Sequence, residues 1–107
     1  MKEEFQSQFV AHKRENSVHR LKTWPEYFNK VASGSKTFEI RVDDRNFQVN
    51  DELLLEEYIP KDYKWKFLHQ NQEGYTGKIL HRRVTSVFRD DLPGIESGYI
   101  LMSIEKI

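Results

Sequence analysis

The sequence predicts an α+β fold, a small barrel or sandwich of about five to seven mostly antiparallel β-strands with one early α-helix. Three observations predict it. One stretch with helical periodicity lies near the N-terminus, the segments after it alternate between apolar and polar residues, and turn residues separate those segments. The length of 107 residues suits a single domain with a core of its own.

The N-terminal 1–16 segment is polar, and we expect it to be an arm or a short helix ahead of the domain at 17–107. A short strand over 18–22 comes first in the domain. The helix that follows should begin near Trp24, because Pro25 fits a first helical turn, where its missing N–H costs no hydrogen bond.

This helix should end near residues 33–34, where a serine and a glycine follow its last apolar residue. Trp24, Phe28 and Val31 recur at i, i+4 and i+7, so we expect them to share its buried face.

The clearest strand runs from residue 36 to 42 and alternates without interruption. We expect Phe38 and Ile40 on the core face, with Glu39 and Arg41 on the opposite face. On this interpretation, replacing Phe38 by alanine would cost about 3–5 kcal/mol of stability.

The remaining strands are expected over residues 52–59, 76–88 and 99–107, with an irregularity at 81–83. An insertion over about 60–74 separates the first two of them. The side chains expected to form the core are Trp24, Phe28, Phe38, Ile40, Leu53, Leu55, Val84, Ile100, Met102 and Ile104.

Composition excludes several function classes. The chain has no cysteine, so it has no disulfide framework, thiolate metal site or cysteine nucleophile. Its histidines lack metal-ligand spacing, and no phosphate-binding glycine motif occurs, so we expect no metal and no cofactor. No apolar run approaches the roughly 18 residues of a membrane span, and the first residues do not resemble a signal peptide. We expect a soluble cytoplasmic protein without a membrane partner.

Charge is balanced overall, with 17 basic and 17 acidic residues, but it is unevenly distributed. Residues 60–89 carry seven bases and two acids, which favours an anionic partner at this segment. Within it, aromatic and basic residues alternate, a pattern that suits stacking on bases and neutralising phosphates. The alternative is a hairpin whose aromatic face covers the barrel. The candidate nucleic-acid contacts are Lys64, Trp65, Lys66, Arg82 and Arg83.

A second candidate site lies in the alternating strand, where Lys36, Glu39 and Arg41 are close in sequence. Exposed ion pairs of this kind contribute about 0–1 kcal/mol and need no functional explanation. The alternative is a polar cleft in which these side chains meet an anionic or hydrogen-bonding ligand.

The segments 19–28, 33–41 and 44–47 resemble the ASCH (activating signal cointegrator homology) domains, in particular a bacterial and phage branch of unknown function. The resemblance continues through 49–55, 75–77 and 98–104. It implies a PUA-like β-barrel that binds RNA, a nucleoside or a nucleotide. The implied ligand site is a cleft beside the first helix, and the residues carried over to it are Lys22, Lys36, Thr37, Glu39 and Arg41.

Some ASCH proteins are amidohydrolases that act on acetylated cytidine through a lysine and a threonine of this segment. The resemblance therefore implies an alternative function, a small hydrolase using Lys36, Thr37 and Glu39. Glu39 stands where those enzymes have their threonine. A further alternative is an accessory protein of a mobile element without a small ligand. The sequence leaves the oligomeric state open.

Overall fold

The computed structural model describes residues 15–63 and 73–107. The elements, in chain order, are β1 (Val18–Thr23), α2 (Pro25–Ala32), β2 (Phe38–Val42), β3 (Glu52–Ile59), β4 (Gly74–Phe88) and β5 (Tyr99–Lys106). The predictions for the N-terminal arm and for Lys64, Trp65 and Lys66 fall largely or wholly outside the described residues.

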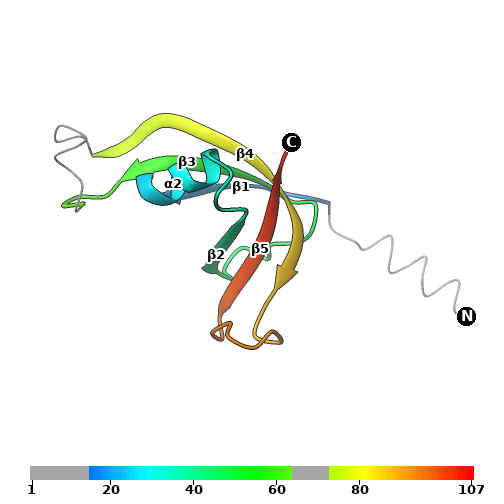
Figure 1. Ribbon diagram of the computed structural model, residues 1–107. Helices are drawn as coiled ribbons and strands as arrows, with labels where there is room; N and C mark the ends of the chain where they lie inside the picture. Colours follow the sequence, from blue (N-terminus) through cyan, green and yellow to red (C-terminus); the bar gives the residue numbers. More distant parts are fainter. Residues whose placement is uncertain (1–14, 64–72) are drawn as a thin grey trace, which may run out of the picture.

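All five strands form one sheet in the order β1-β3-β4-β5-β2. β1 runs parallel to β3, whereas every other neighbouring pair is antiparallel. The sheet curls into a half-barrel, with β1, β3 and the first part of β4 on one side and β5 and β2 turned away from them (Figure 1). The predicted α+β class, with a barrel-like sheet and an early helix, is confirmed.

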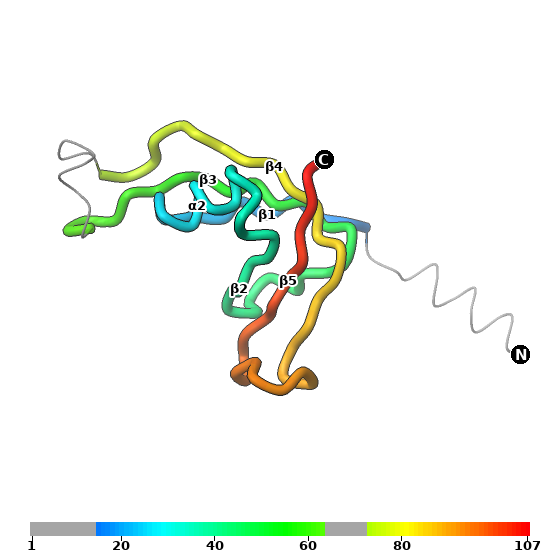
Figure 2. Tube along the Cα trace, in the orientation of Figure 1, coloured from blue at the N-terminus to red at the C-terminus, as the bar shows by residue number. Residues whose placement is uncertain are grey.

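β4 is long enough to belong to both parts of the curled sheet, as the trace in Figure 2 shows. It pairs with β3 along its first part and with β5 along its last part. The register to β5 shifts between Val84 and Ser86, slightly later than the irregularity predicted at residues 81–83. A bulge increases the local bend and twist of a strand, which fits its place where the sheet turns.

α2 begins with Pro25 in its first turn and buries Phe28 and Val31, as predicted. Trp24 does not join them, since 47% of it is exposed. The residue precedes the helix and has extended backbone angles (φ −63°, ψ 150°), so the helical spacing does not apply to it. Among the described residues no helix is long and apolar enough to cross a membrane.

The core lies inside the curl of the sheet. Of the predicted core residues, the buried ones are Phe28, Leu53, Leu55, Val84, Ile100, Met102 and Ile104. Phe47 lies in the connection between β2 and β3. It is also buried, as part of the main hydrophobic core cluster, and was not predicted. Its position outside any strand left no periodicity from which its burial could be inferred.

The prediction for the two faces of β2 is wrong. Glu39 is only 2% exposed, whereas Phe38 and Ile40 are 41% and 52% exposed. Alternation shows that residues separated by two share a face, but it does not show which face meets the core. Here the inner face of β2 lies opposite the end of β1 and the start of α2, and polar contacts with β1 replace apolar packing.

A second buried polar contact ties the start of β1 to the turn before β3. The Nε2 atom of His19 lies 2.8 Å from Oδ2 of Asp51, and the fractional exposures of the two residues are 8% and 0%. Asp51 also accepts hydrogen bonds from the backbone N–H groups of Ser17 and Gln48. These bonds satisfy a carboxylate that would be costly to bury alone.

Candidate ligand-binding site

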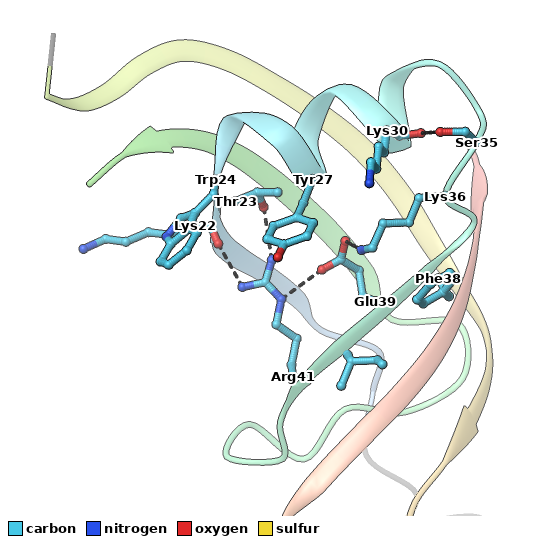
Figure 3. A pocket seen from close by; sticks show the side chains of 11 residues that line it. Lys22, Thr23, Trp24, Tyr27, Lys30, Ser35, Lys36, Phe38, Glu39 and Arg41 are labelled. Atoms are coloured by element: carbon cyan, nitrogen blue, oxygen red, sulfur yellow. Dashed lines mark hydrogen bonds and ion pairs between the residues drawn. The ribbon is translucent and has the colours of Figure 1, made fainter. Parts of the chain in front are cut away.

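A hollow of about 660 Å³ lies between α2 and β2. Its floor is polar, and its rim carries aromatic rings and lysines (Figure 3). The residues around it are Lys22, Thr23, Trp24, Tyr27, Lys30, Ser35, Lys36, Phe38, Glu39, Ile40 and Arg41.

Glu39 forms the centre of the floor. One carboxylate oxygen accepts a hydrogen bond from Nζ of Lys36 at 2.8 Å, and the other accepts from Nε of Arg41 at 2.9 Å. The Glu39 side chain is 3% exposed, the Lys36 side chain 14% and the Arg41 side chain 23%. The two cations therefore compensate the buried carboxylate at the floor of the hollow.

Arg41 is held by more than this ion pair. Its guanidinium also donates to the backbone carbonyl of Lys22 at 2.8 Å and to Oγ1 of Thr23 at 3.1 Å. These contacts cross from β2 to the end of β1, where Thr23 is 2% exposed. A guanidinium has five N–H donors, so donors remain for a ligand beyond the three used in these contacts.

Aromatic rings stand around the upper part of the hollow. Trp24 stacks on Tyr27 with ring centroids 6.4 Å apart, and it meets Tyr63 edge-on at 5.9 Å. Burial raises the pKa of Tyr63. On the β2 side, Nζ of Lys36 lies 5.0 Å from the centre of the Phe38 ring. The hollow thus offers exposed flat rings next to positive charge.

The structure brings Lys36, Glu39 and Arg41 together but places Lys22 and Thr37 differently. Lys22 contributes its backbone, while its ammonium points away and lies 4.4 Å from the centre of the Tyr58 ring on the outer face of the sheet. Thr37 is exposed and does not line the hollow, and its carbonyl accepts a hydrogen bond from Ile104.

The predicted nucleic-acid contacts on β4 lie outside this site. Arg82 is 8% exposed and donates to the carbonyl of His81. Arg83 is half-buried and lies 3.7 Å from a carboxylate oxygen of Glu105. Neither residue lines the hollow.

Sequence reasoning missed Thr23, Tyr27 and Lys30 as parts of the site and assigned Trp24 to the core. A signal was present in the segment that joins a strand to a helix through Trp24 and Pro25. Such a junction leaves the last strand residue and the first helical turn at one edge of the sheet. Only the tertiary structure showed that this edge lies next to Glu39 and Arg41 of β2.

Comparison with known proteins gave two findings. The profile of a family described as Domain of unknown function (DUF3850) matches residues 18–104. A relative from Escherichia phage P2, described as an uncharacterized 12.9 kDa protein in the GpA 3' region, is 31% identical over 85 residues. That similarity covers 79% of this chain and 65% of the relative, so the chain spans just under two thirds of that protein's length. Both findings agree with the expected bacterial or phage family of unknown function.

Proposed function

The chain belongs to the DUF3850 family, whose description names no activity, and we propose from its site that it binds a nucleotide or one nucleotide unit of an RNA strand in the hollow between α2 and β2. The resemblance to ASCH domains supports this proposal, because it implies a nucleotide or RNA ligand in a cleft beside the first helix. Of the residues that the resemblance carries over, all but Thr37 line the hollow: Lys22, Lys36, Glu39 and Arg41.

The observation that carries the proposal is the fixed position of Arg41. Three acceptors hold its guanidinium in place before any ligand arrives, so a ligand would lose little binding energy to ordering it. Arginine suits phosphate and the acceptor edges of bases, because its planar fork can donate two parallel hydrogen bonds.

The rim supports the same class of ligand. Trp24 and Tyr27 are 47% and 43% exposed, and both line the hollow. A base stacked on such a ring contributes about 1–3 kcal/mol. The side chains of Lys30, Lys36 and Arg41 place three positive charges around one carboxylate, so the hollow has an excess of positive charge for a phosphate.

We expect replacement of Arg41 by alanine to weaken binding of a phosphate-bearing ligand by about 1.5–3 kcal/mol, the scale of a charge-assisted hydrogen bond. That loss corresponds to a Kd about 10–150 times higher. The measurement begins with a thermal-shift screen of nucleosides, nucleoside monophosphates and short RNA. Calorimetric titration of the best ligand then compares the variant with the unaltered protein.

Arg45 provides a matched control for this measurement. Arg45 follows β2 and, like Arg41, donates to a carbonyl of β1, that of Arg20 at 2.8 Å, but it does not line the hollow. Arg45→Ala should leave the Kd unchanged. Equal losses in the two variants would contradict a ligand contact by Arg41, and no binding of any nucleotide or RNA would contradict the proposed function itself.

The contacts favour binding over the hydrolase alternative. A nucleophilic lysine must present its amine to the substrate, whereas Nζ of Lys36 is engaged with the carboxylate of Glu39 at 2.8 Å. Both Glu39 oxygens already accept hydrogen bonds, and Thr37 does not line the hollow. Incubation with acetylated cytidine should therefore release no acetate, which product analysis by chromatography would detect.

A further inference from the structure

Two tyrosines form an aromatic surface on the outer face of the sheet, beside β1. Tyr58 on β3 pairs with Tyr75 on β4, and their rings meet edge-on with centroids 5.0 Å apart. Tyr58 is half-buried, whereas Tyr75 is 56% exposed. Neither ring belongs to the main core cluster or lines the hollow, so the core and the site described above leave this surface without a role.

Two cations of β1 lie on the same face. Nζ of Lys22 is 4.4 Å from the centre of the Tyr58 ring and 5.8 Å from that of Tyr75, within the range of cation–π contacts. Arg20 donates from Nε and Nη2 to the carboxylate of Glu56, and its side chain is 70% exposed. A guanidinium has five N–H donors, so donors remain for a phosphate. The two cations exceed the one carboxylate that they meet, which favours an anionic ligand.

Lys22 connects this surface to the hollow. Its carbonyl accepts a hydrogen bond from Arg41 at 2.8 Å, and the residue lines the hollow. Its side chain extends away from the hollow, past Trp24 (Figure 3). Neighbouring strands are about 4.8 Å apart, so Tyr75, two strands from β1, is about 10 Å from it across the sheet. A ligand that leaves the hollow over Lys22 therefore reaches the two tyrosines directly.

We propose that the ligand is a single strand of RNA, which continues from the hollow over β1 onto the outer face of the sheet. There a base stacks on Tyr75, and the connecting phosphates lie against Lys22 and Arg20. This inference rests on the proposed function and extends it from one nucleotide to a strand. Proteins that bind single strands combine aromatic rings for stacking with a positively charged path for the backbone, and the two surfaces together provide both.

The dependence of affinity on strand length tests this inference. The probes are adenylate and uridylate series from the nucleoside monophosphate to the tetranucleotide, measured by calorimetric titration at low salt. One stacked base contributes about 1–3 kcal/mol, so the Kd should fall about 5–150-fold along the series. Tyr75→Ala should remove this gain and leave the Kd of the monophosphate unchanged, because Tyr75 does not line the hollow. Tyr75→Phe, which keeps the ring, should retain the gain.

Tyr99→Ala is the matched control, because Tyr99 is a tyrosine of β5 that is 38% exposed and does not line the hollow. It should leave the Kd of the tetranucleotide unchanged. Equal Kd values for the monophosphate and the tetranucleotide would overturn the inference and leave the proposed function of the hollow intact. So would equal effects of Tyr75→Ala and Tyr99→Ala. If no probe binds, the proposed function and this inference both fail.

Salt dependence tests the contact of Lys22 with a phosphate. Each phosphate neutralised on a single strand contributes about −0.7 to the slope of log K against log salt concentration. Lys22→Gln should therefore make the slope for the tetranucleotide less steep by about 0.7. Lys106→Gln, which changes an exposed lysine at the end of β5, should leave the slope unchanged. The same slope in Lys22→Gln as in the unaltered protein would overturn the path over β1.

Discussion

Replacing Phe47 by alanine is expected to lower the free energy of unfolding by about 3–5 kcal/mol, a large part of the stability of a domain of this size. Phe47 is 1% exposed, it belongs to the main core cluster, and its ring centroid lies 4.6 Å from that of His19. The substitution leaves a cavity that the surrounding strands can fill only in part. Urea unfolding followed by circular dichroism measures the loss.

Phe38→Ala is the matched control, since the same side-chain atoms are removed from a surface that is already 41% exposed. We expect the free energy of unfolding to change by less than about 1 kcal/mol, as for surface substitutions away from special contacts. A loss at Phe38 equal to that at Phe47 would contradict the orientation of β2 described here.

Replacing Glu39 by glutamine should lower the free energy of unfolding by about 2–3 kcal/mol. Removing one partner of a fully buried ion pair costs about 3–5 kcal/mol, because the other charge remains without compensation. Two features act in opposite directions here. Glu39 compensates both Lys36 and Arg41, whereas water reaches part of each cation and reduces the cost. Denaturant unfolding at low and high salt measures the effect.

Glu56→Gln is the control for Glu39, because Glu56 also accepts a hydrogen bond of 2.8 Å from an arginine, Arg20. This pair lies on the outer face, and the Arg20 side chain is 70% exposed, so solvent screens the interaction and the loss should be clearly smaller. The Arg20 hydrogen bonds lower the pKa of Glu56. The contribution of this ion pair to the free energy of unfolding is therefore present at neutral pH. It is lost on acidification through the lowered pKa of Glu56. If Glu56→Gln lowers the free energy of unfolding as much as Glu39→Gln does, burial of Glu39 between two cations is not what makes it important for stability.

Local patterns were sufficient to predict the elements. Pro25 and the serine and glycine after the helix indicated where α2 begins and ends, because both signals act through the backbone of a few residues. Alternation indicated β2 and β5, and a leucine-rich run indicated β3. The core residues predicted on β3 and β5 are buried: Leu53, Leu55, Ile100, Met102 and Ile104. The ion pairs of Lys36 and Arg41 with Glu39 join residues within three positions, so the sequence alone brought them together.

What the sequence by itself determined about this protein is therefore its α+β class, the identity of its elements and the local cluster at Lys36, Glu39 and Arg41. Only the tertiary structure decided which face of β2 turns inward, because a period of two is the same for either face. The contacts of Arg41 with Lys22 and Thr23 join residues 19 and 18 positions apart, respectively. Such contacts depend on how the sheet curls, and no local backbone preference reports on that curl.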